Sequence, residues 1–581
     1  MENMDSLIES SGAATRNQMF VSRKKNRGKC VTVIAVASIV VVAMIMCEPI
    51  GVNALSRSRE GYVAAQELEP SIEIESVCSP TLYPESCRVT LSSYLTSSSN
   101  GVTLQNKQQV LHIAAMVAMK EANRAFVQAS AFFNQTHYQI AVGDCVELID
   151  ITKDQLSSSL SLLQQDGMNA REHSEVRALL SAAITNMETC HDGILEKSDG
   201  KSEAGLLSSV ERVKVFASNC LAILVNTKSN WADKLALPST PIKEGFPWWV
   251  SAADRRILQT SANDINADVV VAADGSGNFK TITEAINKAP EKSSKRHVIK
   301  VKKGTYKEYV EVGKTKTNIL LIGEGMKRTI VTGSRNVVDG STTFKSATFA
   351  VVGKGFMAQD IAFVNTAGPK KHQAVALRVG SDQSVFYRCK IAGHQDTLYT
   401  HSLRQFYREC LVLGTVDFIF GNSAVVLQSC TLLPRKPGQS QKNAITAQGR
   451  TDPNQDTGIS IHSCNITADS DLVPVKTSFP TYLGRPWKEY SRTVYMQSFL
   501  GDAINPAGWL EWSGDFALKT LYYGEYKNSG AGARTGNRVK WGGYHVIKSS
   551  KEAIKFTVDE FIQGNEWLQA TGVDYITGLT D

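Results

Sequence analysis

Polar residues that recur at a nearly constant interval between Gln373 and Asn422 constrain the fold of this chain more than any other feature. Gln373 and Gln395 are 22 positions apart, and Asp396 and Asp417 are 21 positions apart. A repeat of about 20–25 residues is typical of solenoids, in which every coil stacks on the one before. The interval therefore predicts a parallel β-helix from this part of the chain.

The same interval predicts a cluster of four side chains. Neighbouring coils of a β-helix lie about 4.8 Å apart, so Asp396 and Asp417 would face each other with Gln373 and Gln395 beside them. Two carboxyls at that separation cannot both ionise cheaply, so one is expected to stay protonated near neutral pH. A single such aspartate would more often cap a turn. Four polar residues at one period favour an acyl-transfer or hydrolytic site with an acid, a nucleophile and oxyanion donors.

Three motifs hold these residues: Q-A-V-A-L-R (373–378), G-H-Q-D-T-L (393–398) and G-T-V-D-F-I-F-G-N (414–422). Together with L-G-R-P-W (483–487) and G-T-Y-K-E (304–308), they closely resemble plant pectin methylesterases from about residue 268 to the C-terminus. The resemblance implies an all-β, right-handed parallel β-helix. It also implies hydrolysis of the methyl esters of homogalacturonan to pectate and methanol, without a cofactor, in cell wall modification.

The residues suggest a role for each member of the cluster. Asp417, which is flanked by apolar residues, would attack the ester carbonyl and expel methanol, leaving an acyl-enzyme that water then hydrolyses. Asp396 would be the proton donor to the leaving methoxide and would later take a proton from that water. Gln395 and Gln373 would donate hydrogen bonds to the oxyanion. These roles match those that the family assigns to its corresponding residues.

Further residues are candidates for binding the substrate. Arg485 has two predicted partners, because it could orient the Asp417 carboxylate or bind a carboxylate of the substrate. Trp487 would offer an apolar platform to a sugar ring. Thr343, in G-S-T-T-F (340–344), matches a substrate-contacting threonine of the family, and Gln373 would contact the substrate as well. For three aromatic residues the sequence leaves open whether they line the cleft or belong to the core: Tyr399, Phe418 and Trp512.

Other mechanisms and functions have less support. The chain has no G-x-S-x-G or H-E-x-x-H motif and no clustered metal ligands, so His394 is interpreted as structural and no metal is expected. A glycoside hydrolase is the alternative enzyme, because paired carboxylates on a β-helix can also cleave sugar chains. The neighbouring glutamines favour the esterase, since a tetrahedral acyl intermediate needs oxyanion donors. A non-enzymatic inhibitor or wall-binding protein is the third alternative, and the complete motif set argues against it.

Chain length and net charge limit the number of domains and the class of binding partner. A chain of 581 residues is too long for a single core, and its net charge of +7 suits an acidic polysaccharide better than nucleic acid, for which no binding motif is present. Residues 1–54 contain a basic stretch and then an apolar run at 31–46, which predict targeting to the secretory pathway. A cleaved signal peptide and a signal-anchor both remain open. Membrane contact would be confined to this segment, and the mature enzyme is expected in the extracellular cell wall.

An all-α domain is predicted before the β-helix. Residues 55–77 are assigned to a linker and residues 78–235 to a four-helix bundle, because amphipathic segments recur near 107–133, 138–164, 172–192 and 206–224. With C-S-P-T-L-Y-P-E-S-C at 78–87, this region resembles the inhibitor-like pro-region of the same family. The resemblance implies the bridges Cys78–Cys87 and Cys145–Cys190. It also favours an autoinhibitory role, or a folding aid, over a spacer.

Residues 236–267 are assigned to a second linker, in which the pair Arg255-Arg256 would be cut by a processing protease. The β-helix domain would then span residues 268–581, with helical caps at 281–289 and 558–568. The mature enzyme is expected to be a monomer that binds pectin and is inhibited by its own pro-region or by separate inhibitor proteins.

Two kinds of covalent feature complete the predictions. Cys389 and Cys410 bracket the Asp396 loop, and a disulfide between them would fix it. Cys220, Cys430 and Cys464 are expected to be buried thiols. Sequons at Asn134 and Asn465 predict glycosylation.

Overall fold

The computed structural model describes residues 72–97, 107–133, 136, 138–164, 168–198, 200–226 and 266–580. The predicted signal segment, the Arg255-Arg256 processing site and the Asn134 sequon lie outside the described residues. Within the described ranges, no helix combines the length and the apolar character needed to cross a bilayer.

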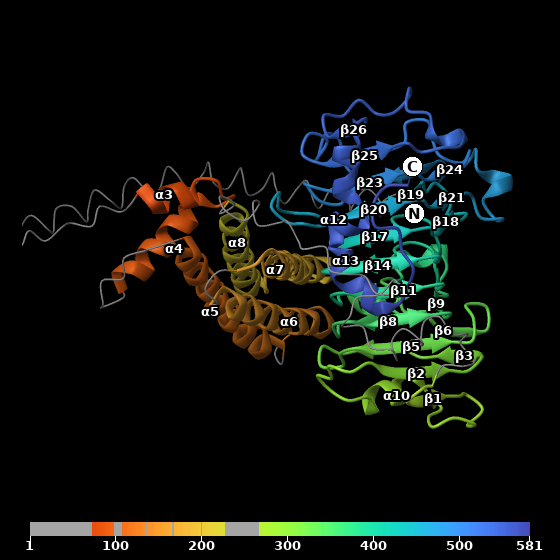
Figure 1. The fold of residues 1–581 in the computed structure, drawn as a ribbon, viewed down its shortest axis with the longest axis horizontal. Helices are drawn as coiled ribbons and strands as arrows, with labels where there is room; N and C mark the ends of the chain where they lie inside the picture. The colour runs from red at the N-terminus through yellow and green to blue at the C-terminus, as the bar shows by residue number, and fades with distance from the viewer. Residues whose placement is uncertain are drawn as a thin grey trace, which may run out of the picture. The chain divides into compact units, whose positions relative to one another are not determined.

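Residues from 269 onward form a parallel β-helix, as predicted, in which strands stack into three parallel sheets (Figure 1). The first sheet holds, in order, β1 (Val269–Val271), β2 (His297–Val301), β5 (Ile319–Gly323), β8 (Met357–Gln359), β11 (Ser384–Tyr387), β14 (Arg404–Arg408), β17 (Ala424–Gln428), β20 (Gly458–His462), β23 (Arg492–Met496), β25 (Tyr522–Tyr526) and β26 (Tyr544–Val546). The second holds β4 (Val310–Val312), β7 (Phe349–Val351), β10 (Leu377–Val379), β13 (Leu398–Thr400), β16 (Ile419–Gly421), β19 (Asn443–Gln448) and β22 (Thr481–Gly484). The third holds β3 (Gly304–Lys307), β6 (Thr329–Gly333), β9 (Ala362–Asn365), β12 (Lys390–Ala392), β15 (Leu411–Gly414), β18 (Thr431–Pro434), β21 (Asn465–Ile466) and β24 (Phe499–Leu500).

The coils stack in register because apolar residues at equivalent positions meet inside. Leu377 pairs with Leu398, and Leu398 pairs with Ile419, so one coil in this region takes 21 residues. All three side chains lie in the same fully buried core cluster, while the alternating residues of these strands point to the other face. The period inferred from the polar residues is therefore the period of the folded coil.

The predicted disulfide between Cys389 and Cys410 is wrong, because both thiols are free and buried. Each cysteine follows a residue of positive φ at a turn and points into the core. The Cys389 thiol donates a hydrogen bond to the Ala358 carbonyl at 3.4 Å, and the Cys410 thiol donates to the Phe386 carbonyl at 3.2 Å. Each sulfur is thus directed at the backbone of the coil before it. Cys430 and Cys464 continue this thiol ladder, also as buried free thiols.

The two predicted caps have different outcomes. Helix α10 (Ile282–Lys288) begins with a capping box between Thr281 and Glu284, packs into the core, and lies beside β1 at the end of the stack (Figure 1). The segment predicted as the C-terminal cap does not close the opposite end. Its helices α12 (Val558–Ile562) and α13 (Gly564–Trp567) instead cover the outer face of the first sheet, against apolar residues such as Leu320 and Phe406.

The N-terminal domain is helical. Its described helices are α3 (Ile72–Cys78), α4 (Pro84–Ser97), α5 (Lys107–Phe133), α6 (Gln139–Leu163), α7 (Ala170–Lys197) and α8 (Ala204–Asn226). The four long helices α5 to α8 pack around one apolar core, in agreement with the predicted bundle. Helix α3 begins within the predicted linker at 55–77 and ends at Cys78, the first residue of the predicted bundle. The predicted bridges Cys78–Cys87 and Cys145–Cys190 are both formed, and Cys220 is a buried free thiol.

The helical domain packs against the outer face of the second sheet. Its core cluster also includes residues of that face, among them Tyr399, Phe420 and Ala447. Three other core clusters consist only of residues from 267 onward. The β-helix therefore has an apolar core of its own, while the face that contacts the helical domain would be uncovered without it.

Candidate active site

Asp396 and Asp417 occupy the same place in neighbouring coils. Each lies two residues before a strand of the second sheet, β13 and β16, whose first residues are paired in register. Both have left-handed backbones, with φ of 60° and 52°, a conformation that aspartate tolerates better than most residues. The Asp396 N–H donates to the Val416 carbonyl at 3.0 Å, which holds the two turns together. The structure thus brings together the two carboxyls that the sequence spacing predicted.

Asp417 is held by Arg485, so the structure contains one of the two contacts predicted for this arginine. The Arg485 Nε donates to Oδ1 of Asp417 at 2.8 Å, and Nη2 donates to Oδ2 at 2.8 Å. The guanidinium carbon lies 4.3 Å from the ring centre of Trp512, so this ring contacts the planar face of Arg485. Such a two-point contact fixes the orientation of the Asp417 carboxylate.

Asp396 has the opposite electrostatic setting. Burial, the neighbouring Asp417 and, more weakly, Glu196 of helix α7 raise the pKa of Asp396 well above its usual value, while Arg485 acts in the other direction. No positive side chain forms an ion pair with Asp396 among the described residues. Burial and the second carboxyl therefore favour the protonated form of Asp396, in the direction that the spacing of the two aspartates predicted.

The two glutamines lie beside the carboxyls. Gln395 directly precedes Asp396, and the Ala374 N–H, next to Gln373, donates to the Gln395 carbonyl at 3.3 Å. Both glutamine side chains are partly exposed. The Oε1 of Gln395 is buried without a hydrogen-bond partner in the described part of the chain, so the fold does not engage this amide oxygen.

His394, interpreted as structural from the sequence, takes part in this turn through its backbone. Its carbonyl accepts hydrogen bonds from the Thr415 N–H and from the Thr397 hydroxyl, both at 2.9 Å. Burial, with Arg435 nearby, lowers the pKa of His394 to about 4, so its ring is neutral near neutral pH. In the described ranges, no group of three or more histidine, cysteine, aspartate or glutamate side chains is arranged to hold a metal ion.

Aromatic side chains form the surface next to the carboxyls. Tyr399 and Phe420 are in register on β13 and β16, and their rings stack with centres 4.2 Å apart. Trp487 meets Phe420 edge-on at 5.9 Å and lies close over Gly449, where a Cβ would come within 2.7 Å of its ring. Phe418, by contrast, is fully buried in the core. Of the aromatics left open by the sequence, Tyr399 thus belongs to the site face and Phe418 to the core.

Helices α6 and α7 of the helical domain contact this face. Glu196 accepts hydrogen bonds from the backbone N–H and the hydroxyl of Thr343, both at 3.2 Å. Lys488 forms ion pairs with Glu188 and Asp192 at 2.7 and 2.8 Å. Lys488 directly follows Trp487, but nothing in the sequence pointed to it, because a single lysine carries no signal of its own.

Arg378 was also missed, although it ends the motif Q-A-V-A-L-R. It points from β10 to the same face as Tyr399, its register neighbour. The carboxylate nearest to it belongs to Glu147 of helix α6, at 3.8 Å. Only the folded domains bring these residues to one surface.

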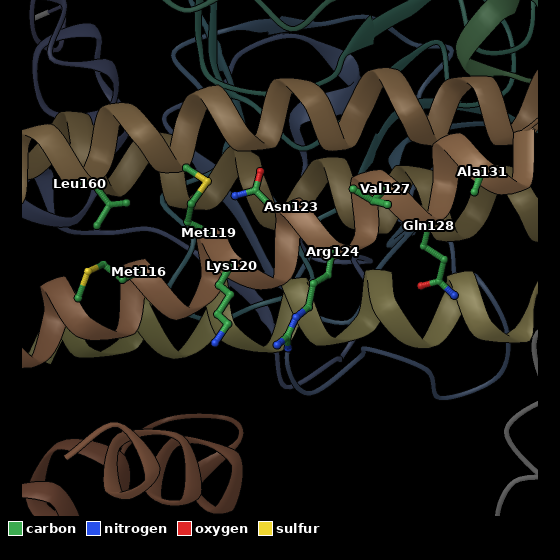
Figure 2. Close-up of a pocket in the computed structure, with 9 residues that line it drawn as sticks. All are labelled: Met116, Met119, Lys120, Asn123, Arg124, Val127, Gln128, Ala131 and Leu160. Atoms are coloured by element: carbon green, nitrogen blue, oxygen red, sulfur yellow. The ribbon is translucent and has the colours of Figure 1, made fainter. Parts of the chain in front are cut away.

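A groove of about 790 Å³ lies elsewhere, on the helical domain (Figure 2). It is lined by side chains of α5 and by Leu160 of α6. The view shows methionine and valine side chains together with Lys120 and Arg124, and none of the carboxyls described above. This groove is therefore separate from the candidate active site.

Comparison with known proteins identifies both domains. The family model described as pectinesterase matches residues 268–565, and the one described as plant invertase/pectin methylesterase inhibitor matches residues 73–223. A pectinesterase/pectinesterase inhibitor U1 of Solanum lycopersicum is 47% identical over 587 residues, covering 97% of this chain and 100% of the relative. A pectinesterase/pectinesterase inhibitor of Ficus pumila var. awkeotsang is 49% identical over 509 residues, covering 87% and 91%.

A solved pectin methylesterase from carrot is 62% identical, with a TM-score of 0.54, and its match covers 54% of this chain and 99% of the carrot chain. The chain therefore belongs to the pectinesterase family, with pectin methylesterase activity and an inhibitor-like N-terminal domain.

Proposed function

We propose that the β-helix domain, residues 268–581, hydrolyses the methyl esters of homogalacturonan with Asp417 as the nucleophile. The observation that carries this proposal is that two adjacent carboxyls lie in different electrostatic surroundings. Asp417 accepts two hydrogen bonds from Arg485, and burial together with Asp417 raises the pKa of Asp396 well above its usual value. An anionic nucleophile and a neutral acid on the same face are what acyl transfer requires.

The steps follow from this arrangement. Asp417 attacks the ester carbonyl, and the oxyanion accepts hydrogen bonds from the amides of Gln373 and Gln395, each worth about 3 kcal/mol in the barrier. Asp396 protonates the departing methoxide, which leaves as methanol. Water then attacks the acyl-enzyme while Asp396 takes its proton, and the free uronate and Asp417 are regenerated. Trp487 and Thr343 contact the sugar chain beside the reacting ester.

The experiment uses residues 259–581, because the β-helix has its own core and the pectinesterase family model matches residues 268–565. Methanol and new reducing ends are measured together on highly methyl-esterified pectin. We expect methanol without reducing ends, and no methanol from Asp417→Asn. A matched control is Asp360→Asn, since Asp360 also has a positive φ of 54° and a two-point contact with an arginine, Arg388, but lies on another turn. New reducing ends without methanol would instead establish a glycoside hydrolase.

We further infer that the helical domain is an autoinhibitory pro-region. Glu196 engages Thr343, a predicted substrate contact, and helical residues share a core cluster with Tyr399, Phe420 and Trp487. The uncleaved chain should therefore release methanol at least about tenfold more slowly than residues 259–581. Equal rates for the two proteins would contradict the inference.

The remaining proposals concern the targeting, cleavage, inhibition and glycosylation of the protein. The N-terminal segment would direct the protein to the secretory pathway and the cell wall, and a protease would cut after Arg255-Arg256 to release a monomeric enzyme. Separate inhibitor proteins would then take the place of the helical domain. Asn465, whose side chain is exposed on β21, and Asn134 would carry glycans, which mass spectrometry of the secreted protein would detect.

A further inference from the structure

The outer face of the third sheet ends in an exposed aromatic side chain. β24 is the terminal strand of this sheet and pairs with β21, beside which it lies in Figure 1. Leu500 points into the core, so Phe499, the residue before it, points to the outer face, and it is 46% exposed. Its ring lies against Gly530, where a Cβ would come within 2.9 Å of Cε2. The edge of a sheet with an exposed aromatic ring favours unwanted association unless something covers it.

Asn465 is the neighbour of this ring on the preceding coil. Asn465 pairs in register with Phe499, and the next pair, Ile466 and Leu500, is buried in the core. Asn465 and Phe499 therefore point to the same outer face, about 4.8 Å apart along the stack. Asn465 is exposed and begins the sequon N-I-T at 465–467. A glycan on Asn465 would start directly beside the Phe499 ring.

The chemistry of the first sugar suits this ring. N-acetylglucosamine, the sugar that is joined to asparagine, presents C–H groups on the faces of its ring, and the face of a phenylalanine ring is electrostatically negative. Contact between the two also removes apolar ring surface from water. The neighbour of Asn465 on the other side is Thr431, which is followed by Leu411, and neither offers an aromatic face. Phe499 is therefore the aromatic partner that this row of side chains provides.

We propose that Phe499 binds the first N-acetylglucosamine of a glycan on Asn465, and that this contact secures the terminal strand of the third sheet. The inference rests on the proposed glycosylation of Asn465. The coil that ends in β24 begins with β22, and Arg485 directly follows that strand. Local opening of the coil would therefore disturb the arginine that holds Asp417. The attached sugar covers the exposed edge and makes this opening rarer.

The test uses the full chain secreted by yeast cells, with mass spectrometry to establish that Asn465 carries a glycan. Hydrogen exchange of the peptide that covers β24 measures how often this strand opens. The Leu500 N–H, which donates to the Ser529 carbonyl at 2.8 Å, is the reporter. In Asn465→Gln, this amide should exchange about fivefold faster than in the glycosylated chain. A glycan that is cut back enzymatically to its first sugar should retain the full protection.

Replacing the ring tests the contact itself. In Phe499→Ala, exchange at Leu500 should be the same within about twofold with and without the glycan. Phe499→Leu keeps an apolar side chain without the aromatic face, and the glycan should give it little protection. A matched control is Val546→Ala, because Val546 is 45% exposed and lies on β26, the terminal strand of the first sheet. In this control the glycan should still protect β24 about fivefold.

Two results would overturn the proposal. Protection that persists in Phe499→Ala, or that disappears when only the outer sugars are removed, would show that the glycan acts through its bulk alone. Mass spectrometry that finds Asn465 without a glycan would instead refute the proposed glycosylation, and the inference with it.

Discussion

Two buried aspartates of the β-helix should respond to pH in opposite ways, and the contrast tests the protonation state on which the mechanism depends. The side chains of Asp396 and Asp382 are buried to a similar extent. Burial and Asp417 raise the pKa of Asp396 well above its usual value. The pKa of Asp382 is lowered by Arg404, which outweighs burial and donates hydrogen bonds at 3.0 and 2.7 Å. We replace each aspartate with asparagine in the full chain.

The sign for Asp396 follows from proton linkage. An unfolded aspartate loses its proton near pH 3.9, so above that pH the folded state binds one more proton than the unfolded state. Ionisation of the unfolded chain therefore costs the native protein about 1.4 kcal/mol of stability for each pH unit, up to the raised folded pKa of Asp396. An asparagine at this position has no proton to lose. The unfolding free energy of Asp396→Asn minus that of the unmodified chain should therefore increase as pH rises.

Asp382 gives the opposite pattern. Its lowered pKa means that its contribution to stability is present above about pH 3.9 and is lost as pH falls through the folded pKa. Removing it leaves Arg404 buried without a counter-charge, at a cost of about 3–5 kcal/mol. The loss in Asp382→Asn should therefore be constant between pH 5 and 7.

Urea unfolding between pH 4.5 and 7, followed by the fluorescence of the buried Trp509, measures both differences. Differences between variants remove the titration of all groups that they share. If the difference between Asp396→Asn and the unmodified chain does not change over this range, Asp396 is ionised in the native protein and its role as proton donor is refuted. Methanol release should be lost in Asp396→Asn at every pH.

Four further outcomes are expected. Arg485→Met should lower kcat on methyl-esterified pectin at least about 100-fold, because it removes the two-point contact with Asp417. The control Arg388→Met should change kcat less than about twofold, and equal losses in the two variants would contradict the role of Arg485 in holding the nucleophile. Lys488→Met should raise the activity of the uncleaved chain several-fold, because it removes two ion pairs with helix α7, and an unchanged rate would count against autoinhibition. Burial raises the pKa of Asp144, which accepts a hydrogen bond from a threonine of the β-helix, to about 7. Contact between the domains should therefore weaken, and activity of the uncleaved chain rise, as pH increases from about 4 to 7, and Asp144→Asn should abolish that rise. Reduction with dithiothreitol should destabilise the helical domain by about 3 kcal/mol and leave the β-helix unchanged, whereas a loss in the β-helix would mean that Cys410 is disulfide-bonded.

The sequence predicted those features that a repeat determines. The 21-residue interval between Asp396 and Asp417 is the length of one coil, so it placed both carboxyls on one face before any contact was known. The amphipathic pattern of the four long helices was equally informative, because 3.6-residue periodicity is a property of the helix itself. Motifs shared with plant pectin methylesterases added Arg485, and the structure shows its contact with Asp417.

Features that depend on tertiary contacts could not be predicted in this way. The segment 558–568 is helical as expected, but it covers a sheet face, since the apolar residues it meets come from many coils. Cys389 and Cys410 are close in sequence and in space, yet their sulfurs point at backbone carbonyls of the preceding coils. Arg378 and Lys488 form their ion pairs with carboxylates of the helical domain, which are far away along the chain.

The ladder of free thiols has a consequence for how the protein matures. Four reduced cysteines lie at equivalent turns of successive coils, in a chain that also forms two disulfides and is proposed to pass through an oxidising compartment. Nothing but burial separates these sulfurs from oxidants and from the cysteines of the helical domain. The coils must therefore fold faster than thiols exchange. A variant that folds slowly should form non-native disulfides even where its folded state is still stable. Brief alkylation during refolding would record the order in which the coils become inaccessible.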